Sequence, residues 1–153
     1  IAEAIAMMIK EGEPAADKAR AIVKSLTEKY PLQLTGWHTK RRCHSIHDNN
    51  QAMHKIDPQM LWMNPVDAAA RNLQDGDLAE VFNDRGRIRM PVRVTDRIMP
   101  GVTAISQGAW YRPDENGTDT AGSINVLTSL HPTPYARGNG QHTNLVEVTR
   151  YGL

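Results

Sequence analysis

Cysteine is nearly absent from this chain, which has a single one, Cys43, among its 153 residues. One cysteine excludes an internal disulfide, and it excludes zinc and iron–sulfur sites that are built from four cysteines. Long apolar runs are also missing, since none approaches the roughly 20 residues that a membrane-spanning helix needs. Aromatic residues make up only 5% of the chain, so aliphatic side chains must fill the core.

An excess of charge of one sign is lacking too, because 18 basic residues stand against 17 acidic ones and the net charge is +1. That balance argues against a protein whose main partner is nucleic acid, although a local basic patch could still bind a few phosphates. The length suits one ordinary domain with a sizeable core.

Familiar catalytic signatures do not occur: there is no Walker loop, no Gly-x-Ser-x-Gly elbow and no Rossmann fingerprint. The pair His44 and His47, with His38 and His54 nearby, matches no strong zinc spacing. Cys43 beside His44 does not make a catalytic dyad by being its neighbour in sequence, and we expect a buried, inert thiol. The sequence therefore contains no recognisable set of catalytic residues that would be complete by itself.

Helical periodicity is confined to the first 30 residues. Apolar residues recur there at helical spacing, namely Ala15, Ala19, Ile22, Val23, Leu26 and Tyr30. Pro14 suits a first helical turn, Pro31 ends the pattern, and Gly12 separates an earlier short helix. We predict a helical lead-in at residues 1–29, to which no chemistry is assigned, and a second domain at residues 30–153.

The chain begins at Ile1, and its opening segment is apolar with no basic region before it. A signal peptide requires such a basic region, so we interpret the start as a cut inside a longer protein.

Strand patterns dominate from Pro31 onward. Residues 78–82 and 87–94 are expected strands with a hairpin connection between them, and Pro91 predicts an edge or a bulge in the second. The other expected elements are strands at 32–34, 102–106 and 144–150, a short helix at 66–72, and long loops at 107–123 and 131–143. The expected fold is mixed and mainly β, a barrel with short helices behind a helical lead-in.

The densest polar segment is residues 35–45, which combines a glycine for close backbone approach with hydroxyls, three cations and two imidazoles. Its candidate ligand-binding residues are Thr35, Gly36, Trp37, His38, Lys40, Arg41, Arg42, His44 and Ser45. Such a loop can bind a diphosphate through backbone N–H groups and charge-assisted hydrogen bonds. A solvated basic turn is the other interpretation, and the residues alone leave both open.

Two further polar sets are candidates. The Asp67 carboxylate, with Asn64 before it, can accept two hydrogen bonds from a guanine edge, but the pair also fits plain helix capping. The last set lies in the long loops and consists of Gln107, Gly108, Trp110, Asn125, His142, Thr143 and Asn144. Its mixed donors and acceptors suit a pterin or a purine, or they satisfy backbone groups in irregular loops.

Taken in order, these segments resemble the C-terminal domain of catalytic subunits in the dimethyl sulfoxide reductase family. The matching strings are residues 30–38, 42–45, 63–68, 75–77, 81–86, 100–102, 108–111, 124–128 and 142–146. Together they cover roughly residues 30–150, and the ordered set is far more specific than any one string. The sequence is most similar to the membrane-associated bacterial A subunits and their paralogues.

The resemblance implies a double-psi β-barrel that holds molybdopterin guanine dinucleotide, two of which bind one molybdenum in the whole catalytic subunit. It implies that residues 35–44 follow a cofactor's phosphates and pterin, that Asn64 and Asp67 receive a guanosine, and that Asn125 and residues 142–144 lie near the pterin. Trp37 stands where relatives often carry arginine, which puts a direct phosphate contact at that position in question.

The implied parent reduces an S-oxide or N-oxide. Its molybdenum ligand and iron–sulfur cysteines lie upstream in the family's chain order, so this chain alone is not expected to turn over substrate. The implied partners are the remaining domains of the parent, an iron–sulfur electron-transfer subunit and a membrane anchor subunit. The resemblance places such a parent in the periplasm or on the membrane facing it.

Two alternatives remain. A double-psi barrel can serve as a protein-docking or recognition module without a cofactor, which would need an exposed apolar patch. A natural free-standing subunit of a molybdenum or tungsten enzyme is the second, and the lack of a starting Met speaks against it.

Overall fold

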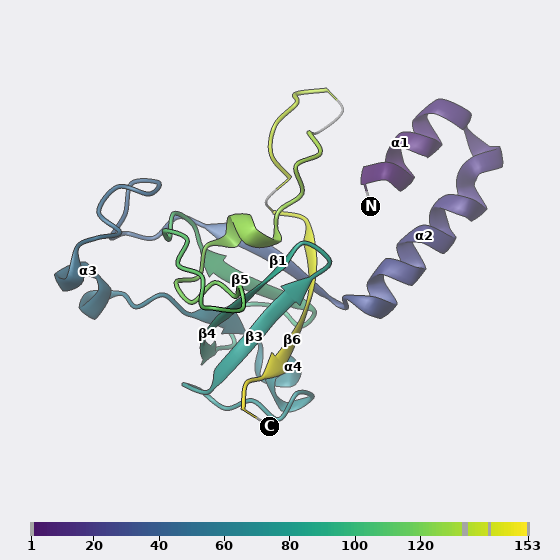
Figure 1. Ribbon diagram of the computed structural model, residues 1–153. Coiled ribbons are helices and arrows are strands. Elements are labelled where there is room, and N and C mark those ends of the chain that lie inside the picture. Colours follow the sequence, from purple (N-terminus) through teal and green to yellow (C-terminus); the bar gives the residue numbers. More distant parts are fainter. Residues whose placement is uncertain (1, 133–134, 141, 153) are drawn as a thin grey trace.

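Six strands close into a barrel in the computed structural model, which describes residues 2–132, 135–140 and 142–152 (Figure 1). They are β1 (Leu32–Trp37), β2 (Leu61–Met63), β3 (Leu78–Asn83), β4 (Gly86–Val94), β5 (Val102–Ser106) and β6 (Asn144–Arg150). Around the barrel the order is β1-β5-β2-β4-β3-β6, so every strand has two neighbours. Closure removes the unpaired edges that an open sheet would expose.

Two of the six pairings are parallel and join strands that are not consecutive in sequence. β1 runs parallel to β5, with Gln33 opposite Val102, and β2 runs parallel to β4, with Leu61 opposite Val92. The other four pairings are antiparallel. Parallel partners need long crossing connections, and two such crossings characterise a double-psi barrel. The mainly β barrel expected from the sequence is therefore confirmed.

Alternate residues of the strands point into the barrel and make up its core. The largest fully buried side chains are Leu32, Leu34, Leu61, Met63, Val81, Ile88, Met90, Val92, Ile105, Val146 and Val148 on the strands, and Leu127 in the 3₁₀ turn Ile124–Leu127. They are aliphatic or methionine, as the scarcity of aromatic residues predicted. This period-two burial is what a barrel wall needs, with one face dry and the other covered by loops or solvent.

The β3–β4 hairpin forms as predicted, with Asn83 opposite Gly86 and a two-residue turn between them. Pro91 does not end β4, which continues to Val94. A residue other than proline would direct its backbone N–H at this position toward β2. The pairing of β4 with β2 begins only at the next residue, Val92, so Pro91 interrupts no hydrogen bond between these two strands. On the other side Val92 donates to the Asp77 carbonyl, so β4 is not an edge strand.

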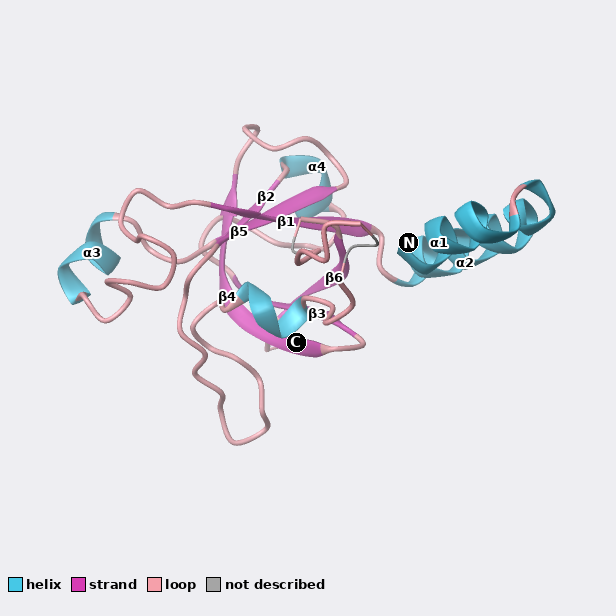
Figure 2. Ribbon diagram, turned by 90° about the horizontal axis from the view of Figure 1, so that it is seen from above, coloured by secondary structure: helices cyan, strands magenta, loops and turns pink. Residues whose placement is uncertain are grey.

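The helical lead-in is a hairpin of α1 (Ala2–Glu11) and α2 (Ala16–Lys29), joined through the 3₁₀ turn η1 (Glu13–Ala15). Gly12, with φ of 69°, breaks the two helices apart as expected. The hairpin stands to one side of the barrel (Figures 1 and 2). Lys29 and Tyr30, at its end, both donate to the Asp84 carboxylate in the β3–β4 turn.

The remaining helices are short: α3 (Gln51–Ile56), α4 (Pro65–Ala69) and the 3₁₀ turn η2 (Ile124–Leu127). The helix predicted at residues 66–72 is thus one residue earlier at its start and three residues shorter at its end. It stops because Asn72 adopts a left-handed conformation, with φ of 53°, and Leu73 N donates back to the Ala68 carbonyl. Within the described ranges, no helix has both the length and the apolar composition needed to cross a membrane.

Candidate functional site

The end of the barrel where β1 and β5 finish, at Trp37 and Ser106, gathers most of the predicted binding residues. Gly36 is buried there, and a Cβ at this position would lie 2.8 Å from Gln107 Nε2. A larger residue here would have to displace the Gln107 side chain, so β1 passes close to the residue that follows β5. This close approach brings residues 35–45 and residues 107–110, predicted separately, to one place.

The loop after β1 divides its charges between solvent and interior. His38, Lys40 and His44 are exposed, and the two imidazole rings meet edge to face with centroids 5.7 Å apart. Arg41 and Arg42, in contrast, are only 5% and 6% exposed. Three basic side chains thus remain open to an anionic ligand, whereas both arginines turn inward.

The single cysteine lies on the same loop. Cys43 is exposed, so the expected buried thiol is wrong. The reason is that its two neighbours on the N-terminal side, Arg41 and Arg42, occupy the interior of the loop and turn Cys43 outward.

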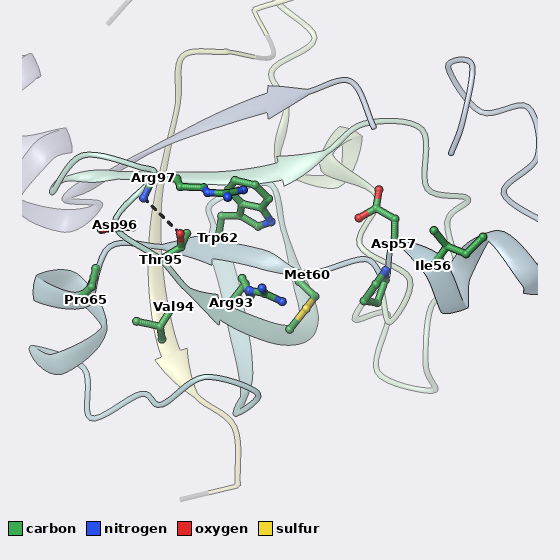
Figure 3. A pocket seen from close by; sticks show the side chains of 11 residues that line it. Ile56, Asp57, Met60, Trp62, Pro65, Arg93, Val94, Thr95, Asp96 and Arg97 are labelled. Carbon is green, nitrogen blue, oxygen red and sulfur yellow. Dashed lines mark hydrogen bonds between the residues drawn. The ribbon is translucent and has the colours of Figure 1, made fainter. Parts of the chain in front are cut away.

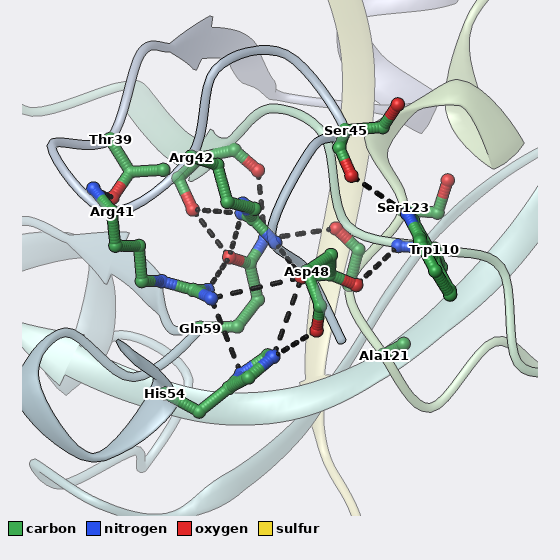
Figure 4. Close-up of polar contacts among 12 residues, drawn as sticks. Thr39, Arg41, Arg42, Ser45, Asp48, His54, Gln59, Trp110, Ala121 and Ser123 are labelled. Carbon is green, nitrogen blue, oxygen red and sulfur yellow. Dashed lines mark hydrogen bonds and ion pairs between the residues drawn. The ribbon is translucent and has the colours of Figure 1, made fainter. Parts of the chain in front are cut away.

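The Asp48 carboxylate forms ion pairs with both buried arginines (Figure 4). Arg42 Nη1 donates to Asp48 Oδ1, and Arg41 Nη1 lies 3.7 Å from the same oxygen. Gln59 Oε1 accepts from Arg41 Nη2 at 2.9 Å and from Arg42 Nη2 at 2.6 Å, and Ser106 Oγ accepts from Arg42 at 3.0 Å. Charges buried in this way need paired partners, so the arginines brace the loop and are not free cations.

His54 of α3 closes this network from the other side. Its Nε2 lies 2.6 Å from the Asp48 carbonyl oxygen and its Nδ1 lies 3.3 Å from Arg41 Nη1. Because Arg41 can only donate, Nδ1 is the acceptor in its contact with Arg41, and Nε2 faces the Asp48 carbonyl oxygen as a donor.

The protonation states follow from these contacts. Burial alone raises the pKa of the Asp48 carboxyl, but the Trp110 backbone N–H and the Arg42 guanidinium outweigh it and hold that pKa below its usual range. Burial, and after it the neighbouring Arg42 charge, lowers the pKa of Arg41. A guanidinium remains protonated at neutral pH even so, and Asp48 is therefore an ionised carboxylate between two cations.

Several buried donors at this end have no acceptor among the described residues. They include Trp37 Nε1 and Gln107 Nε2, both from the predicted site. A buried donor without a partner costs roughly 1–3 kcal/mol, so such atoms mark positions where an acceptor belongs. The Trp37 ring also packs on Trp62, with centroids 5.0 Å apart. Phosphate or pterin oxygens fit this donor set.

The loops that follow β5 and precede β6 meet the same end. Trp110 Nε1 donates to the Ser45 carbonyl at 2.8 Å, and Thr35 Oγ1 lies 3.4 Å from His142 Nδ1. Asn144 is 3% exposed and its Nδ2 donates to Thr128 Oγ1 at 3.3 Å, so it supports the loops from within. Asn125 and Thr143 are exposed; residue 141 lies outside the described residues.

Asn64 and Asp67 lie at the opposite end of these strands, since β2 runs antiparallel to β5 and Met63 pairs with Thr103. Asn64 caps α4, with Oδ1 accepting from Val66 N at 2.9 Å and Nδ2 donating to the Ile98 carbonyl at 2.7 Å. The capping interpretation of Asn64 is thus what the structure shows, and both polar atoms of its amide are used.

Asp67 does not cap the helix. Its Oδ2 accepts from Gly101 N at 2.8 Å, and within the described part of the chain Oδ1 has no donor. One carboxylate oxygen therefore remains for a ligand at this end, which lies roughly 15 Å from the other at ~3.3 Å per strand residue.

A cavity of about 580 Å³ runs along the outside of β2 between the two ends (Figure 3). Asp57 lines it at one end and accepts from Thr39, whereas Pro65, the first residue of α4, lines the other. Trp62 forms part of its wall, and the exposed Arg93 and Arg97 line it as well. The cavity thus lies between the two groups of predicted residues, next to Thr39 through Asp57 and next to Asn64 through Pro65, although none of the predicted residues lines it.

Sequence reasoning missed the residues that organise this site. Asp48, Gln59 and Trp62 were not predicted, and only Trp62 carried a usable signal, since it lies directly before the recognisable stretch at 63–68. A lone aspartate or glutamine in a loop has no local pattern, because its role depends on partners far away in the chain. The helix α3 did have a signal, as Asn50 caps it and accepts from Ala52 N.

Comparison with known proteins agrees with this geometry. The family model described as "Molydopterin dinucleotide binding domain" matches residues 32–145. Dimethyl sulfoxide reductase DmsA of Haemophilus influenzae is 53% identical over 125 residues, which cover 82% of this chain and 16% of that protein. Trimethylamine-N-oxide reductase 1 of Escherichia coli is 37% identical over 134 residues, again covering 82% of this chain and 16% of that protein.

Among solved structures, acetylene hydratase from Pelobacter acetylenicus superimposes with a TM-score of 0.70 over 83% of this chain and 19% of its own, at 15% sequence identity. That likeness shows a shared fold. The family match, the high identity to several reductases and the barrel with its polar ends together lead to one conclusion: this chain belongs to the molybdopterin-dinucleotide-binding domains of the dimethyl sulfoxide reductase family.

Proposed function

We propose that this chain is the cofactor-holding domain of a molybdenum-dependent S-oxide or N-oxide reductase, and that it binds molybdopterin guanine dinucleotide. Residues 1–29 would be a helical lead-in and residues 30–153 the cofactor barrel. The chain spans only 16% of the length of its relatives DmsA and trimethylamine-N-oxide reductase. The remaining domains of a parent catalytic subunit would therefore complete the site, with a second dinucleotide and the molybdenum.

The observation that carries this proposal is the cavity along β2, which lies between the two groups of predicted residues. A dinucleotide is elongated, with a pterin at one end, a base at the other and two phosphates between them. The cavity offers Asp57 near the first loop, Pro65 at α4, and two arginines, Arg93 and Arg97, between. Neither arginine has a carboxylate within ion-pair distance among the described residues, so both can meet phosphate oxygens.

Several of the predicted residues then have a task that their surroundings support. The exposed His38, Lys40 and His44 offer donors to the phosphates, and Trp37 Nε1 and Gln107 Nε2 offer buried donors to pterin or phosphate oxygens. Asn125, His142 and Thr143 would face the pterin, and the buried Asn144 would support these loops from within. When bound, the molybdenum cofactor supplies the two-electron chemistry, and the protein supplies orientation and electrostatics. We expect no turnover from this chain alone.

The Asp67 carboxylate supports the choice of guanine. Its Oδ1 has no donor among the described residues, and Oδ2 accepts from Gly101 N with one lone pair and keeps the other, so the two N–H donors of a guanine edge can meet the two oxygens. Adenine presents a ring acceptor where guanine presents a donor, so the same carboxylate would repel it. Asn64 would act by holding α4, and with it Asp67, in place.

The wider assembly is part of the same proposal. In the parent, an iron–sulfur subunit would deliver electrons and a membrane anchor subunit would hold the enzyme at the periplasmic face of the membrane. The similarity to several dimethyl sulfoxide reductase chains supports this setting.

A docking role is the second candidate, and one observation favours it. The α1–α2 hairpin has an apolar cavity of about 640 Å³ that Met8, Ala19 and Val23 help to line. This surface belongs to the lead-in, whereas the polar residues cluster on the barrel. Docking through the hairpin would therefore not replace a cofactor as the ligand of the barrel.

A calorimetric titration with GMP and GDP, and with AMP as the competing base, tests the proposal. We expect guanine nucleotides to bind more tightly than AMP, and Asp67→Ala to remove that preference. Asp17→Ala, on the exposed face of α2, is the matched control and should bind as the unaltered chain does. Equal affinity for GMP and AMP would contradict the guanine assignment.

A further inference from the structure

Asp48 is 2% exposed and lies where two of the candidate loops meet. We infer that Asp48 is a positioning residue that locks residues 38–48 and residues 107–110 into one rigid binding surface. The inference rests on the proposed function for the ligand, but it concerns contacts that exist without one. Nothing in the family match or in the relatives' names assigns this aspartate a role.

The two carboxylate oxygens of Asp48 serve different loops (Figure 4). Oδ1 accepts from Arg42 Nη1 within its own loop. Oδ2 accepts from the backbone N–H of Trp110, 62 residues further along the chain, at 2.8 Å. One ionised side chain therefore bridges the segment that follows β1 and the segment that follows β5.

Two further contacts at the same junction connect the loop after β1 to the loop after β5. Trp110 Nε1 donates to the Ser45 carbonyl at 2.8 Å. Gly108 has φ of +88°, and a Cβ there would lie 1.7 Å from the His44 carbonyl oxygen. The backbones are in direct contact, so a displacement of one loop must displace the other.

The conformation of the first loop depends on this support. His44 and His47 both have positive φ, of 53° and 73°, which is unfavourable for residues with a Cβ. Such conformations persist only where the surrounding structure imposes them. Asp48 follows His47 directly and fixes Arg42, two residues before His44, so it holds both ends of the strained segment.

The negative charge of Asp48 is needed by the two arginines that are buried beside it. Arg41 and Arg42 are both buried, and the only other carboxylate near them among the described residues is Asp57, 3.9 Å from Arg41 Nε with a side chain that is 36% exposed. Without the Asp48 charge, Arg42 would have no anionic partner and would move toward water. That movement would carry away His38, Lys40 and His44, which the ligand needs in fixed positions.

Asp48→Asn tests the inference, because it keeps the size of the side chain and an acceptor for Trp110 but removes the charge. The matched control is Asp77→Asn, which also removes a carboxylate that accepts from a backbone N–H, that of Gln74, and from an arginine, Arg150. For each variant, amide hydrogen exchange, the Kd for GDP and the thermal unfolding midpoint are measured on the same chain.

We expect Asp48→Asn to raise amide exchange at least tenfold in residues 42–46 and 108–110 together, while the β3, β4 and β6 amides stay protected. The Kd for GDP should rise at least tenfold, whereas Asp77→Asn should change neither quantity. A rise in one loop only, or no rise, would overturn the inference. If the unaltered chain binds no GDP, the proposed function loses support, but the exchange data still decide the role of Asp48.

A second variant covers the case in which Asp48→Asn does not fold. Arg42→Met combined with Asp48→Asn removes both charges and leaves no new unpaired cation in that position. We expect this pair to fold and still to show the joint rise in exchange, because the link to Trp110 is weakened. Protection equal to that of the unaltered chain would count against Asp48 as the positioning residue.

Discussion

The barrel wall and the loops at its Trp37–Ser106 end both contain buried side chains, but of different kinds. In β4, Ile88, Met90 and Val92 are at most 2% exposed and pack with other aliphatic groups. In the loops, Arg41, Arg42 and Asp48 are nearly as buried and interact through charge. Apolar packing is non-directional and tolerates small shifts, whereas paired buried charges specify one geometry. The wall provides stability, and the loops provide a defined surface for a ligand.

The largest effect is expected from opening a cavity in the wall. Ile105 is fully buried, so Ile105→Ala should lower the free energy of unfolding by about 2–5 kcal/mol in urea denaturation. Leu130 is fully exposed, and Leu130→Ala should change it by less than about 0.5 kcal/mol. A small loss for Ile105→Ala would show that the wall is not the main source of stability.

A smaller effect should follow from forcing the two loops apart. Gly108 and Gly117 both have positive φ, but only a Cβ at Gly108 would collide, with the His44 carbonyl. We expect Gly117→Ala to cost about 1 kcal/mol for backbone strain and Gly108→Ala about 3 kcal/mol, since the loop must move as well. Equal losses in thermal unfolding would mean that the contact of Gly108 with His44 is unimportant.

The smallest effect is a difference in acid stability. The pKa of Asp48 is lower in the folded chain than its unfolded value of about 3.9. Its stabilisation is therefore present above about pH 4 and is lost as the pH falls through the lower folded value. Unfolding free energy should decline on acidification below pH 4, and less steeply in Asp48→Asn.

Asp84 contributes to the same decline, because the hydrogen bonds from Lys29 and Tyr30 lower its pKa too. The difference in this decline between the unaltered chain and Asp48→Asn gives the contribution of Asp48 to it. If the unfolding free energy fell equally steeply with pH in the two proteins, the pKa of the buried Asp48 carboxyl would not be lowered by its contacts.

The sequence predicted the barrel better than the site. Alternation in residues 78–82 and 87–94 was enough to place β3, β4 and their hairpin, since burial on one face imposes a period of two. Asn64 and Pro65 likewise predicted the start of α4, as its cap and its first residue. In contrast, the cluster at residues 35–45 looked like one basic loop, and nothing local distinguished the inward-facing Arg41 and Arg42 from the exposed Lys40.

By itself, the sequence determined the mainly β class, the hairpin, the helical lead-in and the family, because these depend on periodicity, turn residues and strings of neighbouring residues. Only the tertiary structure decided that Asp48 pairs with Arg42 and Trp110, and that a cavity along β2 connects Asp57 to Pro65. Such contacts join residues up to 62 positions apart. Their energies depend on burial and mutual distance, which exist only once the barrel has closed.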